Sequence, residues 1–181
     1  WCVWHQAIGD DYKLALQSTD GLDADGAFMN STLPTSTNIT VGGASVNTNA
    51  DGGTYICYAW SPVQGYSKFG SYVGNGSADG AFVYTGFKPA YVIMKRTDAS
   101  GNWVNIDNKR DTNNVVKHRM FQNLTNADNT TRNYIDFYSN GFKMRRDAAS
   151  SDQNNKSGGT YIYMAFGQTL VGTNDIPNNA F

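Results

Sequence analysis

One ten-residue motif occurs twice in the sequence, and this repeat constrains the fold more than any other feature. Residues 51–60 read DGGTYICYAW and residues 157–166 read SGGTYIYMAF, so the copies are identical at six of ten positions, at an offset of 106. Each copy contains a Gly-Gly turn followed by a run of aromatic and aliphatic residues, which favours a β-strand. The repeat therefore predicts two related units in the chain.

Alignment outward from the motif predicts that the first unit is incomplete. Residues 1–4 correspond to residues 103–106. In the second unit this region follows residues 86–96, an apolar run ending in charge that predicts a strand, and the first unit has no counterpart to it. We predict two modules, residues 1–62 and 63–181, of which the first lacks its opening strand. An incomplete module leaves an unpaired sheet edge, which further polypeptide or a strand from a neighbouring chain would complete.

The composition of the chain predicts an all-β fold. Its 181 residues include 20 Asn, 19 Gly, 16 Thr and 11 Tyr, but only six Leu and no Glu, so residues that favour helices are scarce. Asn140 and Gly141, which lie between two alternating runs, are a strong hairpin signal. We predict two related antiparallel β-sandwich modules of the jelly-roll type. The strands predicted from alternation or from apolar runs lie at residues 80–85, 103–106, 135–138, 142–145 and 161–166.

Two long polar segments, residues 20–50 and 108–133, are predicted to be loops, the second with one helical turn around residues 115–124. Because loops often carry function, we expect a binding surface there. Aromatic residues at strand positions are expected in the core, and these are Trp1, Trp4, Trp60 and Trp103. The better candidates for a surface that stacks on sugar rings lie near loops, and these are Tyr12, Tyr66 and Tyr72.

The charge of the chain is low and balanced, with 14 Lys and Arg against 15 acidic residues and a formal net charge of -1. Apart from the adjacent Arg145 and Arg146, the basic residues are scattered, so no basic stripe is available for nucleic acid or an anionic membrane surface. No apolar run approaches the roughly 18 residues of a membrane helix. We therefore expect neither nucleic acid nor membrane as a partner.

Cysteine and acidic residues predict neither a metal site nor a cofactor. Cys2 and Cys57 are too few for a disulfide scaffold or a zinc site, and we expect free thiols, with a single bridge as the alternative. Residues 20–26 contain an Asp-x-Asp-Gly sequence that resembles part of a calcium loop. Because the chain has no Glu to serve as the bidentate ligand, an ordinary Asp/Gly turn is the favoured interpretation.

The sequence predicts no catalytic residues. His5 and His118 are the only histidines, and no Gly-x-Ser-x-Gly elbow accompanies them, so Ser-His-Asp catalysis is disfavoured. A glycoside hydrolase would need two carboxylates, which without Glu would come from Asp107, Asp111 and Asp136. Asp107 aligns with His5 in the first unit, so the first unit lacks the equivalent carboxylate pair. A glycan-active enzyme or a lectin-like carbohydrate-binding module on the same sandwich is the alternative to a non-catalytic protein.

Several segments of the second unit resemble a known family. Residues 66–80 read YSKFGSYVGNGSADG and residues 82–96 read FVYTGFKPAYVIMKR. Together with residues 106–110, 135–143 and 157–165, they resemble a repeat domain of unassigned function in virion proteins of tailed phages, many of them marine. The resemblance covers most of residues 60–166, and that family has no assigned catalytic residues to transfer to this chain.

The resemblance implies a non-catalytic protein of the virion surface, as part of a tail fibre or other appendage, a head fibre or a capsid decoration protein. Its role would be structural and would include attachment to the host surface. The implied partners are other virion proteins and other copies of the chain, in a symmetric homo-oligomer such as a trimer, because closed symmetry multiplies weak contacts. A glycan of the host surface is a further candidate ligand. The position on tail or capsid and the identity of the host stay open.

Overall fold

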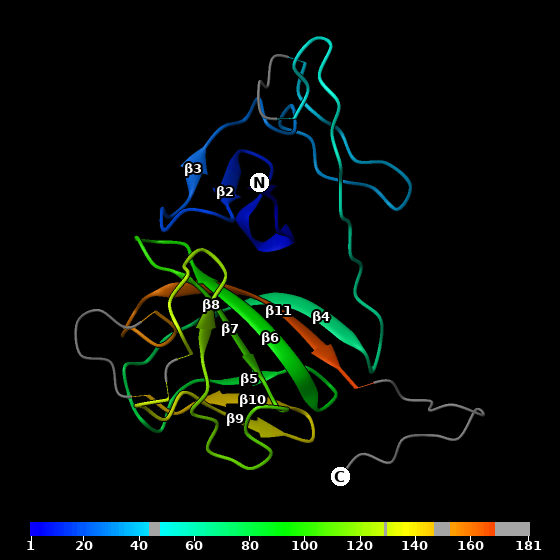
Figure 1. Ribbon diagram of the computed structural model, residues 1–181. Coiled ribbons are helices and arrows are strands. Elements are labelled where there is room, and N and C mark those ends of the chain that lie inside the picture. Colours follow the sequence, from blue (N-terminus) through cyan, green and yellow to red (C-terminus); the bar gives the residue numbers. More distant parts are fainter. Residues whose placement is uncertain (44–47, 129, 147–152, 169–181) are drawn as a thin grey trace.

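The prediction of an all-β sandwich is confirmed. The computed structural model describes residues 1–43, 48–128, 130–146 and 153–168. Its strands form three antiparallel sheets that stack as layers, with a five-stranded sheet between two three-stranded ones (Figure 1). Within these described residues, no helix is long and apolar enough to cross a lipid bilayer.

The middle layer is the five-stranded sheet, with the order β4-β11-β6-β7-β8. Its strands are β4 (Ser67–Val73), β11 (Thr160–Gly167), β6 (Pro89–Arg96), β7 (Trp103–Asp107) and β8 (Met120–Phe121). One outer layer has the order β5-β10-β9. It consists of β5 (Phe82–Tyr84), β10 (Gly141–Met144) and β9 (Ile135–Tyr138). The other outer layer is an N-terminal sheet with the order β1-β2-β3. It consists of β1 (Cys2–Val3), β2 (Tyr12–Ala15) and β3 (Asp23–Ala24), with a 3-10 turn η1 (Gln6–Ile8) after β1.

The strands predicted from alternation lie close to observed ones, namely β5, β6, β7, β9, β10 and β11. The predicted hairpin is the β9–β10 pair, in which Tyr138 lies opposite Gly141. The helical turn predicted around residues 115–124 is wrong. Val116 instead forms a bridge with Ile135 and is 1% exposed, and β8 follows it. Backbone pairing with a neighbouring strand has outweighed the weak local preference of this polar segment.

The main hydrophobic core lies between the five-stranded sheet and the β5-β10-β9 sheet. Alternate residues of a strand point to the same face, so Tyr163 and Ala165 of β11 both enter this core, and the buried Tyr161 stacks on Tyr72, which packs against it. Phe142 of β10 meets Tyr163 edge to face, with ring centroids 5.5 Å apart. This arrangement of aromatic rings stabilises the pairing of the two layers.

A second, smaller core joins the N-terminal sheet to the opposite face of the five-stranded sheet. Ile8 and Leu14 pack there against Trp103 and Ile162. The indole N–H of Trp103 donates a hydrogen bond to the carbonyl oxygen of Ala15 at 2.9 Å. In the described part of residues 1–62, all strands belong to this one sheet, and its apolar face is buried against the second predicted module.

Lys95 of β6 ties the N-terminal segment to the sandwich. Its side chain is buried, and the ammonium donates hydrogen bonds to the carbonyl oxygens of Thr19 at 3.0 Å and Gly101 at 2.8 Å. Burial disfavours the charged form and lowers the pKa of Lys95 from its ordinary 10.5 to about 8.

This burial predicts that stability depends on pH. Between about pH 8 and 10.5 the unfolded chain keeps a proton on Lys95 that the folded chain releases. Lys95 therefore makes the free energy of unfolding rise with pH, by at most about 1.4 kcal/mol per pH unit. Urea unfolding over this range should show that Lys95→Met removes the rise, whereas Lys109→Met, at an exposed position, retains it. An unchanged slope in Lys95→Met would contradict the assignment.

The two copies of the ten-residue motif do not adopt the same structure. The second copy includes most of β11, which pairs with β4 on one side and β6 on the other. The first copy, residues 51–60, is exposed throughout and belongs to none of the described sheets. Figure 1 shows this segment in cyan, running outside the layers before the chain enters β4. The prediction that both copies form strands is wrong for the first, because a strand needs neighbours that pair with its backbone.

The equivalent positions Ile162 and Ile56 give a matched test of this difference. Ile162 is 4% exposed in β11, whereas Ile56 is 67% exposed. Ile162→Ala should therefore lower the free energy of unfolding by about 2–5 kcal/mol. Ile56→Ala should change it by no more than about 0.5 kcal/mol in the monomer. Denaturant unfolding of both variants at low protein concentration measures this, and equal losses would show that both copies are buried strands.

Candidate functional site

Residues 53–62 form an extended segment, here called the aromatic arm, that leads to β4 from outside the three layers (Figure 1). Its side chains alternate between two faces, so Ile56, Tyr58 and Trp60 lie on one face. These three are 67%, 62% and 59% exposed. The ring of Tyr58 stacks on that of Trp60 with centroids 6.2 Å apart and contacts that of Trp1 at 5.9 Å. Aromatic side chains gathered on a protein surface are typical of an interaction site.

The backbone of the aromatic arm, like its side chains, is available for contact with another chain. In the part of the chain that the structure describes, residues 56–60 form no backbone hydrogen bond. The arm is held at its two ends, where the Tyr55 hydroxyl accepts a hydrogen bond from the Ala50 N–H at 2.9 Å and the Ser61 carbonyl accepts one from the Ser67 hydroxyl at 3.0 Å. The segment between these anchors can therefore pair with a strand from elsewhere.

The outer edge of β4 is a second candidate surface, and among the described residues it is unpaired at its far end. β4 is an edge strand, and Ser67 exchanges two backbone hydrogen bonds with Val63, at 2.9 and 3.1 Å, on the side away from β11. Alternate residues of an antiparallel strand direct their N–H and C=O groups to the same side. Ser71 and Val73 therefore direct theirs outward, and both residues are exposed. This edge is a site where another strand can be added.

The aromatic residues predicted from the sequence divide into buried and exposed groups. Tyr12 and Tyr66 are on the surface, as predicted, but Tyr72 packs against the main core and stacks on Tyr161 with ring centroids 5.0 Å apart. Trp103 lies in the core as predicted. The same prediction is wrong for Trp1 and Trp60, which are 64% and 59% exposed. The pattern of Trp60 is that of a buried strand, but among the described residues no strand pairs with its segment.

Asp107 and Asp111 stabilise loops around β7. Asp107 accepts hydrogen bonds from the backbone N–H groups of Lys109 and Arg110, at 2.9 and 3.0 Å, and pairs with the Arg110 guanidinium at 2.6 Å. Burial raises the pKa of the Asp107 carboxyl, but these contacts outweigh it and the net shift is downward. Asp111 accepts the N–H of His118 at 2.9 Å, and its pKa is likewise lowered despite burial. Both carboxylates are thus kept ionised by structural contacts.

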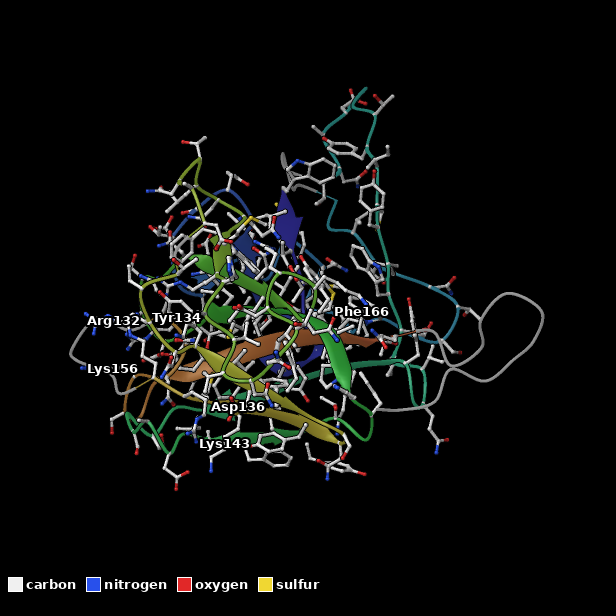
Figure 2. The ribbon with its side chains drawn as sticks, turned by 60° about the horizontal axis from the view of Figure 1, so that its bottom comes forward. Arg132, Tyr134, Asp136, Lys143, Lys156 and Phe166 are labelled. Carbon is white, nitrogen blue, oxygen red and sulfur yellow. The ribbon has the colours of Figure 1, made fainter. Side chains whose placement is uncertain are left out.

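Asp136 and His118 also have defined partners. Asp136, on β9 (Figure 2), is buried, and its carboxylate lies 3.3 Å from the Arg145 guanidinium. Nδ1 of His118 lies 2.5 Å from the Asp128 carboxylate, and this contact raises the pKa of the imidazole. Asp111 lies 3.7 Å from the other ring nitrogen of His118. The three carboxylates from which a hydrolytic pair would have to come are therefore each engaged in a different structural contact.

One known protein family matches nearly the whole chain. A family described as a domain of unknown function (DUF7483) matches residues 1–169. The chain belongs to this family. The DUF7483 match includes the N-terminal sheet, the aromatic arm and the sandwich. No curated protein and no solved structure matches the chain.

In the loop of residues 20–26, which resembles part of a calcium loop, the carboxylates contact the ammonium of Lys13. Asp25 forms an ion pair with Lys13, and the Asp23 carboxylate lies 3.3 Å from the same ammonium. Among the described residues, no group of three His, Cys, Asp or Glu side chains is placed to hold a metal ion. Cys2 and Cys57 are free thiols, as predicted, and Cys57 is exposed on the aromatic arm.

The two histidines of the DUF7483 domain should titrate in opposite directions from the ordinary value of 6.5. The buried His5 accepts a hydrogen bond from the Ala7 N–H, and burial lowers its pKa. His118 should titrate above 6.5 because Asp128 stabilises its charged form. NMR titration of the two imidazoles measures both midpoints. Asp128→Asn should lower the midpoint of His118 and leave that of His5 unchanged, and a shift of both would indicate a general change of fold.

Proposed function

We propose that the chain is a non-catalytic structural module of a phage virion surface protein, whose copies assemble through the aromatic arm. The resemblance to virion repeat domains supports the virion surface as its location. The observation that carries the assembly is the exposed, unpaired arm with the sequence of a central strand. Exposed strands with apolar side chains are typical sites of association between chains.

The proposed contact is the addition of the arm of one copy to the outer edge of β4 in a neighbouring copy. The arm shares its sequence pattern with β11, which pairs antiparallel with β4 along seven residues. The same residue types are therefore compatible with β4 as a neighbour. Backbone hydrogen bonds would give affinity, and the alternating aromatic side chains would give specificity.

The arm leaves its own β4 edge for a physical reason. The Val63–Ser67 bridge would bring the preceding residues beside β4 if pairing continued. However, the carbonyl oxygen of Phe69, the next outward group of β4, already accepts a hydrogen bond from the Gln6 side chain at 2.8 Å. The edge beyond it, at Ser71 and Val73, stays open to a second copy. A head-to-tail exchange of this kind gives a closed ring, such as the expected trimer, where the rotation between copies closes, and an open filament where it does not.

The carboxylates support a non-catalytic role. Asp107 and Asp111 accept backbone N–H groups of their own loops, and Asp136 pairs with Arg145. A glycan-active enzyme built on these groups would need one of them as a general acid with a raised pKa. The pKa values of Asp107 and Asp111 are shifted downward instead.

Ile56→Pro tests the assembly, because proline removes the backbone N–H that strand addition needs. Light scattering coupled to size-exclusion chromatography should show a wild-type oligomer and a monomeric variant, and circular dichroism should show that the variant keeps the wild-type fold. Ile39→Pro is the matched control, since Ile39 is 50% exposed in a loop, and it should assemble like wild type.

Labelling of Cys57 with a maleimide gives an independent readout in a Cys2→Ser background. Cys57 should react rapidly in the Ile56→Pro monomer and slowly in the wild-type oligomer. A wild-type chain that stays monomeric with a reactive Cys57 would contradict the proposal. A monomer with a protected Cys57 would do so as well, because the arm would then lie on its own β4.

A further inference from the structure

A basic pocket of about 320 Å³ lies at the sandwich, where segments from four loops meet. It is lined by parts of the β4–β5 loop, the β7–β8 loop, the segment before β9 and the end of β10. None of the described residues that line it is acidic. The lining residues with side chains that donate hydrogen bonds include Lys117, Thr130, Thr131, Arg132, Arg145 and Arg146. Positive charges that are far apart in the sequence thus converge on one cavity.

Backbone hydrogen bonds hold the walls of this pocket in place. Val116 exchanges hydrogen bonds with its neighbours before and in β9, donating to Ile135 and accepting from Tyr134, each at 2.9 Å. The N–H of Arg145 donates to the carbonyl oxygen of Tyr134 at 3.0 Å. Lys117 follows Val116 directly, and Arg132 precedes Tyr134 by two residues. The segments that carry the cations are therefore fixed relative to one another.

A buried amide fixes the remaining wall. Asn155 is fully buried, and its side-chain NH₂ donates to the carbonyl oxygens of Ser77 at 2.8 Å and Arg146 at 2.9 Å. Its side-chain oxygen accepts the N–H of Asn75 at 3.1 Å. These bonds join the loop that carries Ala78 to the end of β10. A buried polar group with satisfied hydrogen bonds makes such a junction rigid.

The charge of the pocket is only partly neutralised. Arg145 lies 3.3 Å from Asp136, and the Arg146 guanidinium lies 5.9 Å from the buried ring of Tyr134. Lys117 and Arg132 are exposed and have no ion pair within the described part of the chain. Figure 2 shows Arg132 at the edge of the molecule, with Tyr134 on its inner side. Two cations in a cleft that no ion pair of the described residues neutralises, Lys117 and Arg132, favour an anionic ligand.

We propose that this pocket binds an anionic saccharide through its phosphate or carboxylate group. Guanidinium groups bind such oxyanions with paired hydrogen bonds, and a lysine adds a flexible positive charge. The two threonine hydroxyls and the amide of Asn133 supply neutral partners for sugar hydroxyls. The volume lies at the lower end of the roughly 300–1,000 Å³ of small-molecule pockets, which suits one sugar unit.

A strand of nucleic acid fits these observations less well. It would need a basic stripe that follows its backbone and exposed rings on which bases stack. None of the described lining residues is aromatic, and the ring of Tyr134, 5.9 Å from the Arg146 guanidinium, is fully buried. The saccharide proposal uses no residue of the aromatic arm and does not depend on assembly.

Isothermal titration at low salt tests the pocket with glucose 6-phosphate and glucuronate as anionic probes. Glucose, inorganic phosphate and a short single-stranded oligonucleotide are the comparison ligands. We expect at least one anionic sugar to bind, and glucose and inorganic phosphate to bind at least about tenfold more weakly than it does. Arg132→Gln and Lys117→Gln should each weaken this binding at least about tenfold. Lys109→Gln, an exposed cation outside the lining, is the matched control and should bind like wild type.

Circular dichroism and thermal melting establish that the variants are folded. We expect them to be, because substitutions at exposed positions usually change the stability little. The proposal is overturned if neither anionic sugar binds, or if glucose binds as tightly. It is also overturned if Arg132→Gln and Lys117→Gln bind like wild type. Equal binding of inorganic phosphate would exclude a saccharide site, and tighter binding of the oligonucleotide would assign the pocket to nucleic acid. Assembly through the aromatic arm is measured separately with Ile56→Pro. A negative result for the pocket therefore does not affect the proposed role of the arm.

Discussion

Backbone pairing between neighbouring strands decides which parts of this chain become sheet. β11 has partners on both edges, and its side chains reach both cores, with Tyr163 in one and Ile162 in the other. Residues 56–60 have a closely similar sequence but no paired neighbour among the described residues, and they lie exposed. The same local pattern therefore gives the central strand of the fold in one place and an aromatic arm in the other. The functional proposal for the arm follows directly from this difference.

The three layers depend on contacts that cross between the predicted modules. Trp103 and Lys95 of the middle sheet hold the N-terminal segment by hydrogen bonds to the carbonyl oxygens of Ala15 and Thr19. Because the indole and the ammonium are both buried, these polar contacts also specify how the N-terminal sheet sits. That packing covers the second face of the five-stranded sheet, and within the described residues the outer edge of β4 remains open at Ser71 and Val73.

The fold class and most strands of the second module could be predicted from the sequence, whereas the surfaces could not. The turn preference of Asn140 and Gly141 is a local property, so the sequence alone predicts the β9–β10 hairpin. The exposure of Trp60 and the burial of Tyr72 depend on which strands pair, which a local pattern does not encode. Pairing likewise explains why Val116 joins the core, although its segment reads as a polar loop.

The basic pocket, like the exposed aromatic residues, could not be predicted from the sequence, because it depends on which strands pair. A net charge of -1 and scattered basic residues disfavour an extended anionic partner such as nucleic acid, and the structure does not alter that argument. They do not exclude a compact site, because the register of β9 with β10 and the bridge at Val116 bring separated cations together. A pocket of this size would bind one sugar weakly, but assembly through the arm would present several pockets on one particle. Multivalent contact then converts weak single-site binding into strong attachment, so the two proposals reinforce each other while resting on different residues.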